Sequence, residues 1–185
     1  MRIGLTQRVF EHNNQSYDAT DQAWYTYLSE HTLIPVRNQS PQNLLSLAKI
    51  LDCLIITGGN SPKERIETEL GLIRIMMDMA KPIIGVCHGA FLMTELFGGE
   101  VINCEEGHYN TNHNVTMDGK TVEVNSHHKL QIKTPPAVAT VLAVDDDGYC
   151  ESWMYGSMGA VVWHPERMDN PKLPNGITNL MAMKL

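Results

Sequence analysis

A cysteine with a glycine two residues away on either side is the feature that most restricts how this chain can fold. The residues are Gly85-Val86-Cys87-His88-Gly89. The preceding apolar run, residues 83–86, predicts a buried parallel strand, and residues 90–97 have a helical pattern. Cys87 would then occupy a strand-to-helix turn, where the two glycines remove side chains that would clash. The first amides and the positive end of the helix favour a thiolate and an oxyanion. The spacing therefore predicts a nucleophile elbow with Cys87 as the attacking group.

Apolar runs and helical patterns alternate around this elbow. We expect strands at residues 3–6, 33–36, 51–57 and 83–86, and helices at 18–29, 41–49 and 65–80. Such alternation predicts an α/β fold: a doubly wound, mostly parallel sheet of flavodoxin-like type with helices on both faces.

The texture changes after Glu100. Extra short strands are expected in the C-terminal half, at residues 114–117, 121–125, 139–144, 149–155 and 160–163, before a closing helix at 177–184. Asp118-Gly119 and Asp147-Gly148 are hairpin signals. Since the chain has neither internal repeats nor low-complexity tracts, residues 1–185 are expected to form a single domain.

Composition argues against several classes of function. The chain has 14 Lys and Arg against 21 Asp and Glu, a net charge of -7, and no basic block, so we expect no nucleic-acid or membrane partner. The absence of a long apolar segment predicts a cytoplasmic protein. A metal-binding or sensing protein built on His108, His113, His127 and His128 is an alternative. Their spacing matches no known ligand pattern and no carboxylate completes the set, so we expect no metal and no cofactor.

The candidate partners of Cys87 come from two other strand ends. His164 follows an apolar run and precedes a proline, and Glu166, two residues on, would share its side of an extended backbone and fix the imidazole tautomer. Cys87, His164 and Glu166 then form a triad. In Thr57-Gly58-Gly59-Asn60, a glycine amide can approach an oxyanion. We expect the N–H groups of Gly59 and His88 to form the oxyanion hole.

Ligands bind beyond the carboxyl ends of parallel strands. Arg8 and Arg37 follow the first two predicted strands, so they should share one rim with the glycine loop and the elbow. Either arginine could pair with a diphosphate. Lys63, Lys129 and Arg167 are weaker candidates for that contact.

The three segments T-G-G-N, G-V-C-H-G and W-H-P-E, in this order, resemble the class I glutamine amidotransferase superfamily. The resemblance implies that family's fold, a Cys-His-Glu triad and attack on a glutamine-like amide through a glutamyl thioester, with water releasing glutamate. The gamma-glutamyl hydrolase branch is most similar, given Arg65 with Glu69 and the run Val124-Asn125-Ser126-His127-His128. In that branch this region lies near the glutamyl group. The resemblance therefore assigns substrate contacts to Ser126, His127 and His128, beside Gly58 and Asn60.

The opening residues 4–9 and 17–24 resemble members of this branch that act in surface-polysaccharide biosynthesis, the gamma-glutamyl-CDP-amidate hydrolases. This implies release of glutamate and cytidine diphosphoramidate from a nucleotide-linked gamma-glutamyl substrate. Ammonia-delivering members carry glutamine four residues after the nucleophile, where this chain has Phe91. A glutaminase subunit that passes ammonia to a separate synthetase, and a hydrolase of another gamma-glutamyl amine, remain alternatives. A redox chaperone is disfavoured, because a redox cysteine needs no glutamate-oriented base.

Overall fold

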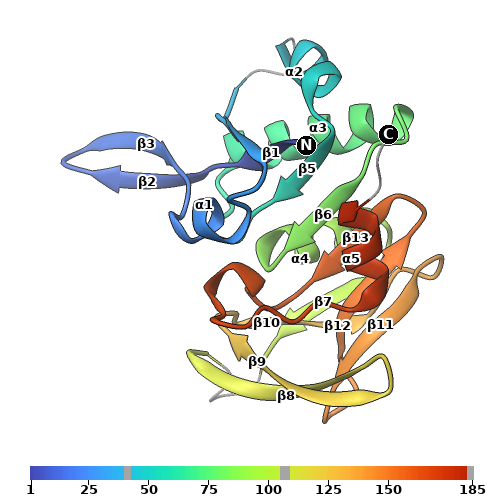
Figure 1. Cartoon of the computed structure of the whole chain (residues 1–185). Coiled ribbons are helices and arrows are strands. Elements are labelled where there is room, and N and C mark those ends of the chain that lie inside the picture. Colours follow the sequence, from blue (N-terminus) through green and yellow to red (C-terminus); the bar gives the residue numbers. More distant parts are fainter. Residues whose placement is uncertain (40–42, 105–108, 183–185) are drawn as a thin grey trace.

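The computed structural model describes residues 1–39, 43–104 and 109–182, and in this part of the chain eleven strands join one sheet (Figure 1). One half of the sheet is parallel. Its strands, in spatial order, are β4 (Thr32–Val36), β1 (Arg2–Thr6), β5 (Cys53–Ile56), β6 (Ile83–Val86) and β13 (Met158–Val161). These strands end at the same edge, which is where the predicted rim residues follow them.

The other half is antiparallel and continues from β13. It contains β12 (Cys150–Tyr155), β11 (Thr140–Asp145), β8 (Thr111–Met117) and β9 (Lys120–Ser126). In addition, β10 (Leu130–Thr134) pairs with both β12 and β7 (Glu100–Asn103). Both predicted hairpin turns are confirmed, with positive φ at Asp118, Gly119 and Gly148.

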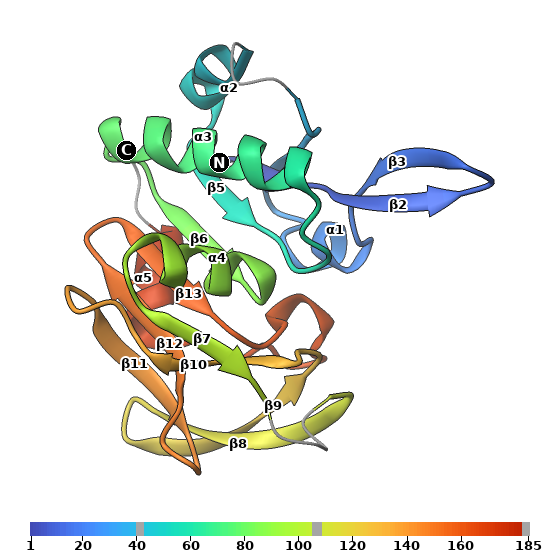
Figure 2. The same cartoon turned by 180° about the vertical axis from the view of Figure 1, so that it is seen from behind.

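Helices cover both faces of the parallel half, so the predicted doubly wound fold is confirmed (Figures 1 and 2). One face carries α1 (Ala23–Tyr27) and α5 (Asn175–Ala182), whose Trp24 and Ile177 lie against Ile55 and Ile84. The opposite face carries α2 (Leu44–Ile50), α3 (Lys63–Asp78) and α4 (His88–Leu96). Buried side chains on both faces of the same strands follow from the alternation of side chains along a strand.

The sequence prediction was wrong for the segment that follows β1. Instead of a helix beginning at residue 18, the chain forms a hairpin of β2 (Arg8–His12) and β3 (Gln15–Ala19), and α1 is only five residues long. The hairpin projects from the body of the molecule (Figure 1). Asn13 and Asn14 both have positive φ, as a tight two-residue turn requires. Strands β7 and β10 were not predicted, and the predicted helix ends at residues 41 and 184 lie outside the described residues.

None of the described helices is long and apolar enough to cross a membrane.

Candidate active site

The predicted strand-turn-helix geometry around Cys87 is confirmed. Cys87 has φ 52° and ψ -104°, a conformation that non-glycine residues rarely adopt, and it directly precedes α4. A Cβ on Gly85 would lie 2.5 Å from the backbone carbon of Gly89, and one on Gly89 would lie 2.3 Å from the carbonyl oxygen of Ile56. Both glycines are therefore required, because helix and strand meet there without room for a methyl group.

The structure brings Cys87, His164 and Glu166 together at this turn. Nδ1 of His164 lies 2.6 Å from Oε1 of Glu166, and the imidazole is hydrogen-bonded to Cys87 on its other side. All three residues are buried. The predicted pairing forms on a different backbone, since Pro165–Arg167 is a 3-10 helix and not an extended segment. The tight turn, and not strand alternation, directs Glu166 back onto the imidazole.

The charge of His164 is set by opposing effects. Burial disfavours the imidazolium most strongly, but hydrogen bonds to Cys87 and Glu166 and the charges of both groups outweigh it and raise the pKa to about 9. Near neutral pH, His164 is therefore a cation held between a carboxylate and the sulfur.

Asn125, at the end of β9, fixes the backbone of His164. Its amide donates to the His164 carbonyl oxygen at 2.8 Å and accepts from the His164 N–H at 2.8 Å. His127 lies with its ring 5.6 Å from that of His164, edge to face. The antiparallel half of the sheet thus positions the imidazole.

The glycine loop after β5 lies against both members of the Cys87–His164 pair. A Cβ on Gly58 would lie 2.4 Å from Cε1 of His164 and 3.3 Å from Cβ of Cys87. Gly59, with φ 133°, lines the same pocket as Cys87 and His88. The residues predicted to form the oxyanion hole are therefore adjacent to the sulfur.

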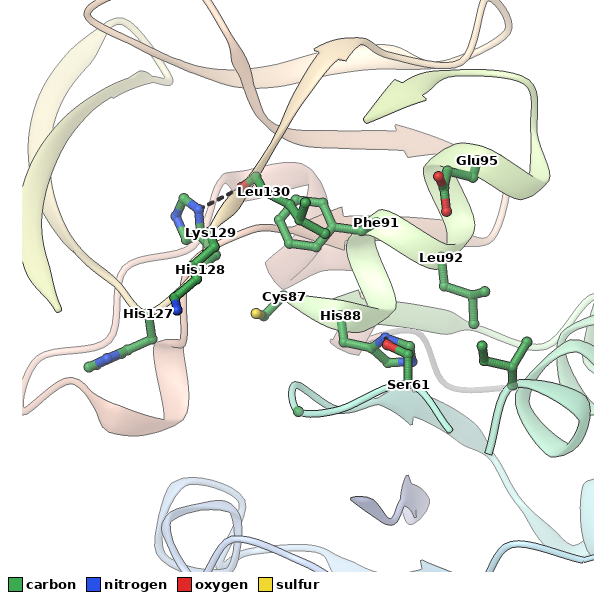
Figure 3. A pocket seen from close by; sticks show the side chains of 12 residues that line it. Ser61, Cys87, His88, Phe91, Leu92, Glu95, His127, His128, Lys129 and Leu130 are labelled. Atoms are coloured by element: carbon green, nitrogen blue, oxygen red, sulfur yellow. Dashed lines mark hydrogen bonds between the residues drawn. The ribbon is translucent and has the colours of Figure 1, made fainter. Parts of the chain in front are cut away.

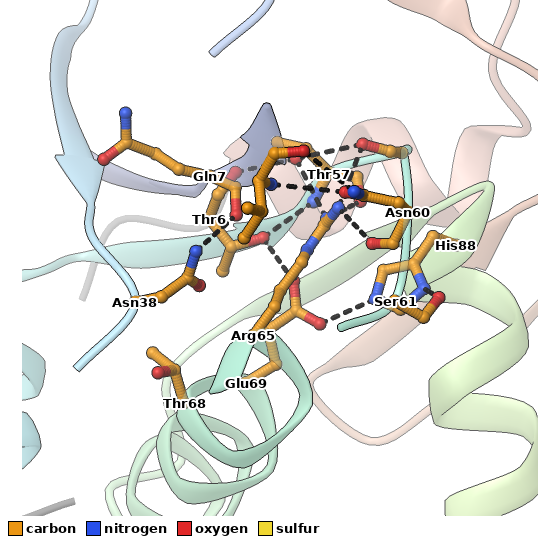
Figure 4. A network of polar contacts seen from close by, with 12 residues as sticks. Thr6, Gln7, Asn38, Thr57, Asn60, Ser61, Arg65, Thr68, Glu69 and His88 are labelled. Atoms are coloured by element: carbon orange, nitrogen blue, oxygen red, sulfur yellow. Dashed lines mark hydrogen bonds and ion pairs between the residues drawn. The ribbon is translucent and has the colours of Figure 1, made fainter. Parts of the chain in front are cut away.

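A buried network holds this loop in place (Figure 4). The guanidinium of Arg65 donates to the carbonyl oxygens of Thr57 and Asn60, the latter at 2.9 Å, and pairs with Glu69 at 2.8 Å. Arg65 and Glu69 are both fully buried. With the loop carbonyls turned toward Arg65, its amides remain available to the pocket side.

The same Glu69 carboxylate reaches His88, the residue after the nucleophile. Oε2 of Glu69 lies 2.7 Å from Nε2 of His88, whose Nδ1 lies 2.8 Å from the hydroxyl of Ser61. Burial acts to raise the pKa of Glu69, but contacts with His88, Arg65 and Thr6 lower it below its ordinary value. One ionised carboxylate thus connects both predicted oxyanion donors.

A pocket of about 300 Å³ opens beside Cys87 (Figure 3). Phe91 lines it from α4 and lies edge to face with His128, at a ring distance of 6.1 Å. Lys129 and Glu95, both exposed, lie at its rim on different sides of Cys87. The pocket is therefore apolar inside and carries opposite charges at its mouth.

Not every predicted substrate contact lines this pocket. His127 and His128 do, whereas Ser126 is fully buried with its hydroxyl 3.2 Å from Nε2 of His128. The amide of Asn60 is committed to the backbone of Val9, donating at 2.8 Å and accepting at 3.2 Å. These contacts stay predictions, and Ser126 and Asn60 also have the structural partners just described.

The rim arginines are arranged in a way that the sequence did not reveal. Arg8 and Arg167 both bind Oδ2 of Asp21, at 3.3 and 2.9 Å. The Arg8 side chain lies close to Gly59, since a Cβ there would be 3.0 Å from Cβ of Arg8. Arg37 is exposed at the end of β4, and Lys63 is exposed on α3, where it pairs with Glu67. Two arginines on one carboxylate leave a net positive charge beside the active site.

The comparisons with known proteins agree with this geometry. The family model for glutamine amidotransferase class-I matches residues 15–182. Anthranilate synthase component 2 of Archaeoglobus fulgidus is 26% identical over 148 residues, covering 76% of this chain and 79% of the relative. Gamma-glutamyl-CDP-amidate hydrolase of Campylobacter jejuni is 25% identical over 146 residues, covering 73% and 69%.

The fold is also found in a solved structure. A candidate GMP synthase glutaminase-type protein from Thermoplasma acidophilum superposes with a TM-score of 0.73 at 18% identity, over 97% of this chain and 91% of that one. The fold likeness and the match over most of the sequence agree with the resemblance expected from the three motifs. The chain belongs to the class I glutamine amidotransferase family.

Proposed function

We propose that this chain hydrolyses a gamma-glutamyl amide through a thioester on Cys87. The observation that carries the proposal is the buried contact of His164 with both Cys87 and Glu166 at the mouth of the pocket. The Cys87 thiolate attacks the amide carbonyl, and the N–H groups of Gly59 and His88 stabilise the oxyanion. The His164 imidazolium protonates the leaving nitrogen and the C–N bond breaks. His164 then takes a proton from water, which attacks the thioester and releases glutamate.

Charges at the pocket mouth support a glutamyl acyl group. A gamma-glutamyl group carries an α-carboxylate and an α-ammonium at its far end. Lys129 and Glu95 lie on different sides of the sulfur and complement those two charges. The carbon chain between them would lie along Phe91.

We further propose that the leaving group is nucleotide-linked, as in gamma-glutamyl-CDP-amidate, so that the products are glutamate and cytidine diphosphoramidate. Two arginines that converge on Asp21 offer planar donors to a diphosphate beside the glycine loop. The similarity to the Campylobacter jejuni hydrolase supports the same substrate. Its use in capsule biosynthesis and a cytoplasmic location belong to this proposal.

The second candidate is a glutaminase subunit that delivers ammonia to a separate synthetase. The similarity to anthranilate synthase component 2 favours it. Phe91 opposes it, because an aromatic ring four residues after Cys87 offers no hydrogen bond to a glutamine amide.

The test is glutamate release from glutamine, a simple gamma-glutamyl amine and gamma-glutamyl-CDP-amidate, with Cys87→Ala as the blank. We expect Cys87-dependent turnover that favours the nucleotide conjugate. Arg8→Gln and Arg167→Gln should raise KM for that conjugate about tenfold or more and leave the simple amine unchanged. Arg2→Gln, an exposed arginine at the amino end of β1, is the matched control. Faster turnover of glutamine, or an equal effect of all three arginine variants, would contradict the proposal.

A further inference from the structure

A second cluster of ionisable side chains lies beyond Phe91 and is not used by the proposed reaction. It contains His113 on β8, His128 between β9 and β10, and Glu151 on β12. Within the described part of the chain, these are the residues whose potential ligand atoms converge, all within 4.8 Å of one another. The three side chains come from separate segments, which makes the cluster a meeting point of the antiparallel half.

Glu151 makes this cluster unusual. Its side chain has no solvent exposure, and among the described residues neither carboxylate oxygen has a hydrogen bond. A buried carboxylate without hydrogen bonds is strongly destabilising unless a cation compensates it. The nearest candidate is His113, whose Nε2 lies 3.5 Å from Oε2 of Glu151.

That distance fits a shared metal ion better than a direct ion pair. Charge-assisted N–H···O contacts have lengths of about 2.7–2.9 Å. Two ligands at about 2.0–2.1 Å from a tetrahedral zinc ion are separated by about 3.4 Å. The observed separation of 3.5 Å is therefore close to one edge of such a tetrahedron.

The third residue is oriented as metal-binding histidines usually are. Nδ1 of His128 lies 2.8 Å from the carbonyl oxygen of Leu130 and can donate to it. This contact favours the tautomer with a lone pair on Nε2, and a backbone carbonyl on the other ring nitrogen is a common partner of a ligating imidazole. The hydroxyl of Ser126 lies 3.2 Å from that Nε2 and can hold the ring in place.

We propose that His113, His128 and Glu151 bind one Zn²⁺ ion, with a water in the fourth position. Two imidazoles and a carboxylate are a familiar zinc ligand set. The ion would compensate the Glu151 charge and join β8, β12 and the start of β10. Because His127 precedes His128 and contacts His164, the site would also fix one wall of the catalytic pocket.

This proposal replaces the sequence-based expectation of no metal. Two of the four histidines in that alternative belong to the cluster, and Glu151 is the carboxylate that the local spacing did not reveal. Of the other two, His127 lies beside His164, and His108 lies outside the described residues.

The experiment measures zinc bound per chain after equilibration with a zinc buffer and dialysis. It uses the full chain carrying Cys87→Ala, so that the catalytic thiol cannot bind the ion. We expect one zinc per chain, with loss in Glu151→Gln and His113→Gln. The matched controls are Glu123→Gln on the exposed face of β9 and His12→Gln on the exposed hairpin, which should retain the ion.

Thermal unfolding gives a second readout. Zinc at about a hundred times its Kd should raise the Tm by about 5–10 °C in the Cys87→Ala chain and not in Glu151→Gln. If Glu151→Gln does not fold, His113→Gln provides the same comparison, because His113 is only partly buried. Full zinc content in both ligand variants, or loss of zinc caused by Cys87→Ala alone, would overturn the site.

Discussion

Gly58→Ala should inactivate the enzyme while leaving the triad residues intact. The added methyl group would lie 2.4 Å from Cε1 of His164 and 3.3 Å from Cβ of Cys87, so it would enter the space between the two reacting groups. The backbone of Gly58 does not have positive φ, and alanine can therefore adopt its conformation. The effect should come from the crowded imidazole and not from strain in the loop.

The size of the effect follows from that contact. Non-bonded carbon atoms prefer separations of about 3.5–4.0 Å, so the His164 ring must move by about 1 Å. A displacement of this size at a catalytic group can reduce the rate by about a hundredfold, or about 2.7 kcal/mol. Overpacking of the buried site should also lower the free energy of unfolding by about 1–3 kcal/mol.

The assay is kcat/KM for glutamate release, with thermal unfolding measured on the same samples. Gly119→Ala is the matched control: its φ is 72°, and no atom lies within 4 Å of the added Cβ. It should lower stability by about 1 kcal/mol through backbone strain and leave kcat/KM unchanged. Wild-type kcat/KM in folded Gly58→Ala would refute the placement of His164 beside this glycine.

Three further predictions concern the groups around the sulfur. Since the pKa of His164 is raised to about 9, its stabilising contribution is complete below about pH 6.5 and is lost as pH rises through 9. The free energy of unfolding should fall by at most on the order of 3 kcal/mol across that window in denaturant titrations, and His164→Asn should flatten the profile. Glu69→Gln should lower unfolding free energy by about 3–5 kcal/mol, because it leaves the Arg65 charge buried without its carboxylate, and should reduce kcat through His88. Phe91→Gln should increase glutamine turnover relative to other gamma-glutamyl amides, and an unchanged ratio in the substrate panel would contradict the role given to Phe91.

The elbow could be predicted from sequence because its requirements are local. A positive φ at Cys87 and the close approach of Gly85 to Gly89 depend on residues within five positions, so the spacing contains the geometry. His164 and Glu166 are likewise near neighbours, although a 3-10 turn and not an extended strand brings them together. The hairpin of β2 and β3 also had a local signal, the asparagine pair at its turn, which the helical pattern of the following residues obscured.

The remaining contacts depend on strand register across long separations. Glu69 meets Thr6 across 63 positions, and Asp21 receives Arg167 across 146. His113 and Glu151 belong to strands separated by β11 in the sheet, so no local spacing brings them together. Periodicity identifies strands but not their order in a sheet, and these clusters depend on that order.

The two halves of the sheet have different tasks in the site, and the division explains why the antiparallel half is present. The parallel half supplies the sulfur and the loop after β5, both fixed by close backbone contacts. His164 follows β13, the last parallel strand, where its backbone would otherwise be free to vary. Asn125 removes that freedom with two hydrogen bonds of 2.8 Å. Because β9 is joined to the parallel half through β8, β11 and β12, the position of the imidazole depends on the whole antiparallel half, including the cluster around Glu151.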